Sequence, residues 1–227
     1  DQCIEFIPIR AATTYINPSF SAVGSSVFEV VDFIPSQHNA DDGYAVIYPI
    51  NQSLLYDGDN GVYTSWPNFP AIGPIQKIFT ATGGVPTNGI EDSASINQST
   101  VTLVTSHRFR RRSPNKRFFV VDDPVSYCVK GDKLYRYSGY GFFETQESAE
   151  ESGSCVVTAP ARCLPNYAAG PARKKVLITD SINSAGTPFR ISSQSLRRNS
   201  LVHIELALAS GGAAITLNHD VLTRGVP

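Results

Sequence analysis

The amino-acid sequence predicts a mainly β protein with antiparallel sheets and long loops. Three observations support this fold class. Aliphatic side chains recur at every second position near the end of the chain. Short runs rich in valine, isoleucine and aromatic residues alternate with segments rich in glycine, proline, asparagine and serine. No segment has the apolar spacing of a long amphipathic helix.

The last 27 residues, Leu201 to Pro227, contain the clearest pattern. Aliphatic residues occupy alternate positions on both sides of Gly211-Gly212. They are Val202, Ile204, Leu206 and Leu208 before the glycines, and Ile215, Leu217 and Val221 after them. This spacing predicts a β-hairpin with one buried face.

Shorter apolar runs predict the remaining strands. They span residues 3–7, 27–34, 44–48, 99–105, 117–121, 125–130, 133–137, 174–178 and 189–191. Gly131-Asp132 predicts a tight hairpin turn between two of these strands. Residues 10–15 are too few for more than one turn of helix, and residues 51–97 predict long ordered loops over the sheet. No linker divides the chain, so we expect residues 1–227 to form one globular domain.

Composition narrows the class of protein. Charged residues make up only 17% of the chain, and serine, threonine and asparagine are frequent instead, as in many extracytoplasmic β proteins. A formal charge of −1 predicts no general attraction to nucleic acid or to an anionic membrane. No apolar run is long enough to span a bilayer.

Four cysteines form an even set without a Cys-x-x-Cys motif. No histidine lies close to them in the sequence, so we expect two disulfides and no metal site. Four cysteines allow three pairings. We favour Cys155–Cys163, which would close a short loop, and Cys3–Cys128, which is the pair that remains.

Residues 107–117 are strongly basic. Six lysines and arginines occur in these eleven residues, together with Phe109. The side chains that could contact an acidic partner subunit, a phosphate or a glycan are Arg108, Arg110, Arg111, Arg112 and Lys116, with the Phe109 ring stacking on a base or sugar. The alternative, which we favour, is a solvated hairpin tip whose charges oppose aggregation.

Acidic clusters allow two kinds of site. Residues 57–61 (DGDNG) place oxygen ligands at alternate positions, as a calcium loop does, but they are also strong turn formers and lack the spacing of an EF-hand. Asp122-Asp123 and Glu147, Glu150 and Glu151 could supply paired carboxylates for acid–base catalysis. We favour a turn for residues 57–61 and solvated surface for the other acidic residues.

The histidines and aromatic clusters have similar alternatives. His203 or His219 could form a catalytic triad with one of the serines. We favour a surface position for His203, which lies opposite the aliphatic face of its strand, and a core or edge position for His219, which shares the face of Ile215 and Leu217. The region around Trp66 and the run from Tyr135 to Phe143 could form a platform for sugar or protein, or could pack in the core. No sequence motif of a hydrolase, metalloprotease or nucleotide-binding loop occurs, so we expect no enzyme and no cofactor.

Several segments resemble minor pilins of MSHA pilus biogenesis of the MshO type. The segment Arg117 to Cys128 (RFFVVDDPVSYC), followed by Leu134-Tyr135-Arg136-Tyr137, resembles the central hairpin of that family. Related J-type pseudopilins of type II secretion carry a similar hairpin. The segments Leu196 to Val202 and Leu217 to Pro227 resemble the closing strand, and Cys3 to Phe6 resembles the first strand after the family's helix.

The resemblance implies a pseudopilin-like α+β fold from which the N-terminal pilin helix is missing. It also implies a structural, non-enzymatic subunit that assembles with other minor pilins and the major pilin, in a tip or priming complex that supports surface attachment. The full-length precursor would be anchored in the inner membrane, with this domain periplasmic before assembly and at the cell surface afterwards. The alternative is a free-standing adhesive or glycan-binding β module.

Overall fold

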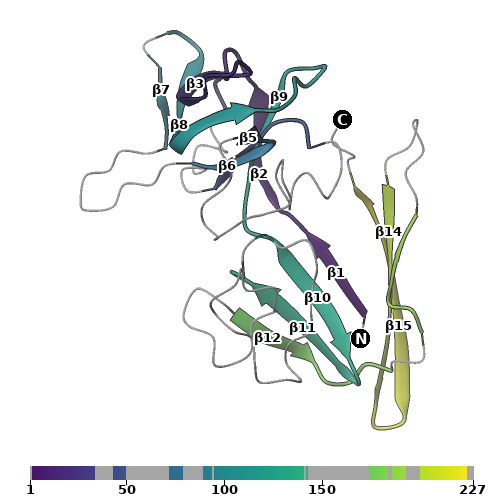
Figure 1. The fold of residues 1–227 in the computed structure, drawn as a ribbon. Coiled ribbons are helices and arrows are strands. Elements are labelled where there is room, and N and C mark those ends of the chain that lie inside the picture. Colours follow the sequence, from purple (N-terminus) through teal and green to yellow (C-terminus); the bar gives the residue numbers. More distant parts are fainter. Residues whose placement is uncertain are drawn as a thin grey trace. The chain divides into compact units, whose positions relative to one another are not determined.

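The structure is a computed structural model that describes most of the chain. The described residues are 2–33, 43–49, 72–78, 89–93, 95–140, 142, 174–183, 186–192 and 200–223. This part is mainly β, without a helix, and its strands form several antiparallel sheets, as the sequence predicts (Figure 1). It contains no helix that is long and apolar enough to cross a membrane.

The contacts divide the chain into two compact units. Unit 1 contains Asp1–Phe6, Pro124–Tyr140 and Leu164–Val226, and unit 2 contains Ile7–Asp123 and Gly141–Cys163 with the last residue. Each unit is therefore built from segments that are distant in the sequence. The single domain predicted from the sequence stays a prediction.

Unit 1 contains two sheets. The first has the order β1-β10-β11-β12, and the second has the order β13-β14-β15 (Figure 1). The strands are β1 (Gln2–Phe6), β10 (Val125–Lys130), β11 (Lys133–Ser138), β12 (Lys174–Thr179), β13 (Phe189–Ile191), β14 (Ser200–Ser210) and β15 (Ala213–Thr223). All pairings within these two sheets are antiparallel.

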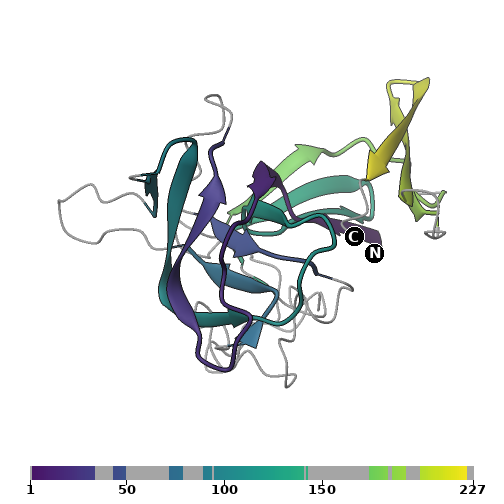
Figure 2. The ribbon, with the colours of Figure 1, turned by 90° about the horizontal axis from the view of Figure 1, so that it is seen from above.

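The predicted hairpin turns of unit 1 are present. Lys130 pairs with Lys133 around Gly131, whose φ of +61° lies in the left-handed region that glycine adopts readily. Ser210 pairs with Ala213 around Gly211 and Gly212, which also have positive φ. Two residues with positive φ match the twist of the flanking strands, so β14 and β15 continue as one long twisted hairpin (Figure 2).

A disulfide and an apolar cluster hold unit 1 together. Cys3 on β1 is bonded to Cys128 on β10, at directly opposite positions of the pair and with 4.1 Å between the Cα atoms. The cluster joins the two sheets through buried Val129, Leu134 and Ile182. The half-buried side chains packed against these three are Tyr127, Phe189, Leu206 and Leu208.

Unit 2 contains two further sheets. Their orders are β2-β9-β4-β6 and β3-β8-β5, and β7 also pairs with β8. The strands are β2 (Ile9–Thr14), β3 (Ser25–Val31), β4 (Tyr44–Val46), β5 (Ile72–Gly73), β6 (Ile75–Lys77), β7 (Ile90–Asp92), β8 (Gln98–Phe109) and β9 (Arg117–Val121). The described strand pairs are antiparallel except for the parallel pair of β5 with β8.

Aromatic residues form the centre of the unit 2 core. The Phe28 ring meets the rings of Phe109 and Phe118 edge-on, with centroids 5.6 and 5.5 Å apart. Edge-to-face contact is a favoured geometry for aromatic pairs. Since these rings come from β3, β8 and β9, they join the two sheets of the unit.

Three local predictions are wrong. Residues 51–97, predicted as long loops, include the strands β5, β6 and β7. Residues 10–15 do not form a turn of helix, because β2 pairs along its length with β9 and takes the extended conformation of its partner. Strands β8 and β9 do not form a hairpin either, because they belong to different sheets. The basic segment between them therefore connects two sheets, and β8 is longer than the predicted strand, ending at Phe109 rather than Thr105.

Candidate functional site

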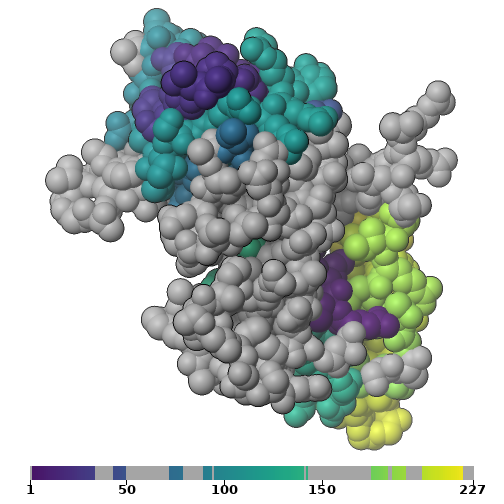
Figure 3. Space-filling view, viewed as in Figure 1, coloured from purple at the N-terminus to yellow at the C-terminus, as the bar shows by residue number. Residues whose placement is uncertain are grey.

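An apolar groove lies between the two sheets of unit 1. Its volume is about 580 Å³. The first sheet contributes Ile4, Glu5, Phe6, Tyr127 and Leu134, and the second contributes Phe189, Ile191, Val202, Ile204, Leu206 and Val221. Figure 3 shows the purple N-terminal strand lying against the green and yellow strands of the same unit. Volume and lining are typical of a binding site for an apolar group.

The two-residue period of the strands explains why the lining is apolar. On β14, Val202, Ile204 and Leu206 share one face, and this face is turned toward the first sheet. On β1, Phe6 points to the same groove, and its ring is stacked on Tyr127 at 6.0 Å and 9°. Phe6 remains 47% exposed, so the groove is open to solvent.

The carboxylate of Glu5, which belongs to the groove lining, is held by hydrogen bonds. The Tyr140 hydroxyl donates to it at 2.6 Å and the Ser126 hydroxyl at 3.3 Å. Both hydroxyl groups belong to buried residues. The carboxylate is thus satisfied within unit 1 and contributes little polarity to the groove.

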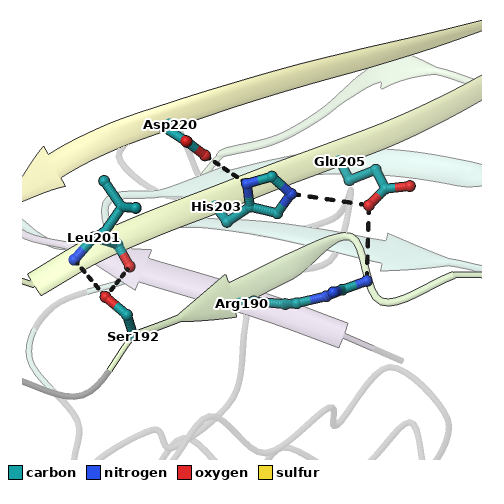
Figure 4. Close-up of polar contacts among 6 residues, drawn as sticks. All are labelled: Arg190, Ser192, Leu201, His203, Glu205 and Asp220. Carbon is teal, nitrogen blue, oxygen red and sulfur yellow. Dashed lines mark hydrogen bonds and ion pairs between the residues drawn. The ribbon is translucent and has the colours of Figure 1, made fainter.

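A polar cluster lies on the outer face of the second sheet (Figure 4). The His203 Nδ1 atom is 2.5 Å from Asp220 Oδ1 on the neighbouring strand. The His203 Nε2 atom is 3.9 Å from Glu205, and Arg190 lies 3.7 Å from that same carboxylate. The cluster places Arg190 and the His203 imidazole beside the carboxylates of Glu205 and Asp220, across three strands, and each of these side chains is at least about one third exposed.

This cluster does not have the arrangement of a catalytic triad. A triad needs a carboxylate on one imidazole nitrogen and a nucleophile on the other. Within the described ranges, both nitrogens of His203 face carboxylates and no hydroxyl bonds to the ring. The cluster can therefore stabilise the pairing of the strands, but it lacks a group to attack a substrate. His219, opposite Ile204, is exposed.

The basic segment is partly inside the protein. His107 and Phe109 are fully buried, because they continue the inward face of β8. The alternative in which the Phe109 ring stacks on a base or sugar is therefore wrong. Of the predicted contact residues, Arg110, Arg111, Arg112 and Lys116 are exposed, and Arg108 is half-buried. These residues do lie together on one connection of unit 2.

The connection has a defined conformation. Ser113 is buried, its carbonyl accepts from the Tyr15 hydroxyl at 3.3 Å, and its hydroxyl accepts from the Arg117 N–H at 3.2 Å. The Arg112 guanidinium lies 4.8 Å from the centre of the Phe20 ring. A cation over an aromatic face is a stabilising contact. At least one of the arginines is thus held by the protein itself.

Asp122 and Asp123 are structural rather than merely solvated, contrary to the prediction. Asp122 is paired with Arg10 of β2 at 2.5 Å, and Asp123 accepts a hydrogen bond from the Tyr44 hydroxyl at 2.8 Å. Both are half-buried. They hold the end of β9, each through its own partner.

The described aromatic residues of the 135–143 run mostly pack inward. Tyr137, Tyr140 and Phe142 are buried, and only Tyr135 is half-buried.

Other predicted features lie outside the described residues. These are Cys155 and Cys163, the 57–61 loop, Trp66, and Glu147, Glu150 and Glu151. Among the described residues, no group of three His, Cys, Asp or Glu side chains could hold a metal ion.

The sequence gives no direct signal for the groove, because its walls come from β1, β10 and the C-terminal strands, which are far apart in the chain. The burial of His107, in contrast, is indicated by the two-residue period of the sequence. The odd-numbered face of β8 contains Val101, Leu103, His107 and Phe109.

Comparisons with protein-family models, curated proteins and solved structures found no match to this chain.

Proposed function

We propose that this chain is a structural minor pilin subunit of an MSHA-type type IV pilus. In this role it takes part in assembly or in a tip or priming complex, and it supports surface attachment. The domain is periplasmic before assembly and lies at the cell surface afterwards, and the full-length precursor is anchored in the inner membrane. The sequence resemblance supports this role, and it is compatible with the mainly β fold.

The apolar groove of unit 1 is the observation that carries the proposal. Open apolar surface of this kind is typical of protein–protein contacts. One wall of the groove is β1, which the Cys3–Cys128 disulfide fixes to the sheet. In the family that the sequence resembles, the strand at this position follows the assembly helix. The groove would therefore lie close to the contacts between subunits.

A non-enzymatic role agrees with the chemistry of the described side chains. The imidazole of His203 faces two carboxylates, and Asp122 and Asp123 have separate structural partners. None of these arrangements provides a nucleophile beside a base.

Binding to purified minor pilin domains of an MSHA-type pilus tests the proposal. We expect measurable affinity, and we expect Ile191→Asp to weaken it about tenfold or more, because the charge enters the apolar groove. Ile191 is 65% exposed, so the substitution leaves the core intact. Ile96→Asp is the matched control, because Ile96 is 88% exposed and lies in unit 2.

Two results would contradict the proposal. One is the absence of affinity for every minor pilin domain. The other is binding to a glycan array without any partner subunit, which would favour the free-standing adhesive module instead. Equal weakening by Ile191→Asp and Ile96→Asp would show that the groove is not the contact surface.

A further inference from the structure

Strand β15 forms a long open edge of the second sheet of unit 1. It has eleven residues and pairs with β14 at every one of them, without a register shift. In the order β13-β14-β15, its other side has no partner strand among the described residues. Such an edge presents a row of free N–H and C=O groups that can pair with another strand.

The other described edge strands carry features that discourage pairing. Strand β12 begins with two lysines, β2 and β3 have irregular registers, and β1, β5, β6, β7 and β13 have five residues or fewer. Strand β15 has none of these features. It contains no lysine, no proline and no bulge, and Asp220 is its only carboxylate. Natural proteins seldom leave an edge of this length unprotected unless another strand covers it.

The apolar face of β15 is also exposed. Ile215, Leu217 and Val221 are 59%, 49% and 38% exposed, and all three lie on the face that β14 turns toward the first sheet. An exposed aliphatic row beside an open edge is the surface that an added strand uses, because main-chain hydrogen bonds and alternate side chains then act together.

We infer that β15 pairs with β15 of a second copy of this chain, antiparallel and centred on Asn218. This register uses all eleven residues, since Ala213 then lies opposite Thr223 of the second copy. It places Ile215 opposite Val221 and keeps the aliphatic side chains of both copies on one face. If the centre moved by half a residue, each aliphatic side chain of one copy would lie opposite a residue from the polar face of the other copy. This second register is therefore excluded.

Charge and symmetry favour a second copy as the partner. Asp220 lies opposite Thr216 in this register, and the two Asp220 carboxylates are roughly 14 Å apart along the strand at 3.4 Å per residue. No like charges oppose each other. The pairing is two-fold symmetric and uses the β15 edge of both copies, and among the described residues the remaining outer edges of the joined sheet are the three-residue β13 strands. The assembly therefore closes as a dimer. This inference does not depend on the proposed function.

Sedimentation equilibrium over a hundredfold range of protein concentration tests the inference. We expect a reversible dimer of twice the 24.6 kDa chain mass. Asn218→Lys places two ammonium groups opposite each other at the centre of the interface, so the dimer dissociation constant should rise about tenfold or more. Asn218 is exposed within one copy, so the fold should be retained, which circular dichroism checks.

The matched control is Asn183→Lys, which adds the same charge at an exposed asparagine of the same unit, away from β15. It should leave the dimer unchanged. Asn218→Asp should also weaken the dimer, and an equimolar mixture with Asn218→Lys should restore it, because opposite charges then meet at the centre. This rescue separates an interface effect from a folding effect.

A cross-link gives an independent readout. Asn218→Cys should form a covalent dimer on oxidation, because antiparallel residues that lie directly opposite are within disulfide reach, and Asn183→Cys should not. A monomer at all concentrations would overturn the inference. So would a dimer that Asn218→Lys leaves intact, or open-ended assembly that grows beyond the dimer with concentration.

Discussion

His203 and Asp220 face each other across the β14–β15 pair, with Nδ1 and Oδ1 2.5 Å apart. The contact lies on the outer face of the sheet, where the two side chains are 36% and 56% exposed. An Asp–His pair is also part of a catalytic triad. Here Glu205 occupies the other side of the imidazole, so the pair is best explained as a cross-strand contact.

The first prediction concerns the strength of this contact. Asp220→Asn should lower the free energy of unfolding by about 1 kcal/mol or less, because both side chains are exposed and water competes for the contact. Urea denaturation of both proteins measures the effect. A loss several times larger would show that the cluster carries more of the hairpin's stability than its exposure implies.

The second prediction concerns the Cys3–Cys128 disulfide. The bridge joins residues separated by 125 positions, so it restricts the unfolded chain strongly. The double variant Cys3→Ala/Cys128→Ala should lose about 2–5 kcal/mol of stability. Denaturation of both proteins with and without a reductant measures the loss. An equal stability of the two proteins under oxidising conditions would contradict the structural role of the bridge.

The third prediction concerns Gly43, which lies close to β9. A Cβ atom at this position would be 2.6 Å from the Val121 carbonyl oxygen and 2.9 Å from a methyl group of Val120. The backbone oxygen cannot move away without disturbing the sheet, so Gly43→Ala should cost about 1–3 kcal/mol. Gly186→Ala is the control, because nothing lies within 4 Å of its added Cβ. The control should change stability by about 0.5 kcal/mol or less.

The sequence predicts regular local patterns well. The hairpin around Gly211-Gly212 and the hairpin around Gly131 are both confirmed, because period-two apolar residues and a turn signal define each of them. The predicted buried face is wrong for β15, where Ile215, Leu217 and Val221 are exposed. The pairing of strands that are distant in the sequence is harder to predict from local patterns. Residues 10–15 include two alanines, which favour helix, yet pairing with β9 makes the segment a strand.

The candidate site cannot be predicted from the sequence either, because it also depends on contacts between distant segments. The groove depends on where β1 and β13 lie against each other, and no local pattern encodes that position. His107 is a neighbour of the arginines in sequence. The two-residue period of β8 instead turns its side chain into the core while Arg110 stays outside.

The fourth prediction concerns the Tyr15 phenol. Burial raises its pKa above the ordinary value of 10.0, although the charge of Arg112 acts in the opposite direction. A raised pKa in the folded state means that the neutral phenol stabilises the fold below about pH 10. This contribution is lost as the pH rises through the folded pKa, so alkaline conditions should destabilise the protein.

Tyr15→Phe removes this ionisable group. The variant should lose about 1 kcal/mol at neutral pH, where the hydrogen bond is missing, and should lose less stability than the parent protein as the pH rises above about 10. Denaturation midpoints at a series of alkaline pH values measure the difference. Parallel curves for both proteins would mean that the Tyr15 phenol is not the group responsible.

The fifth prediction concerns the buried His107. Its Nε2 atom is 3.0 Å from the Gly73 carbonyl oxygen, and its Nδ1 atom is 3.4 Å from the Gln76 amide nitrogen. The Gln76 amide oxygen accepts from the Lys77 N–H at 2.8 Å, which fixes the orientation of the amide. Since a carbonyl can only accept, Nε2 must carry the proton and Nδ1 must accept.

Nitrogen-15 NMR of the imidazole should therefore show the Nε2–H tautomer. His107→Ala should cost about 2–4 kcal/mol, because it leaves a cavity and removes the donor to a buried carbonyl group. Val104→Ala on the same strand is the control, and its side chain is 48% exposed, so it should change stability by about 0.5 kcal/mol or less. A proton on Nδ1 instead would require the Gln76 amide to turn, which would break its contact with Lys77 and contradict the network.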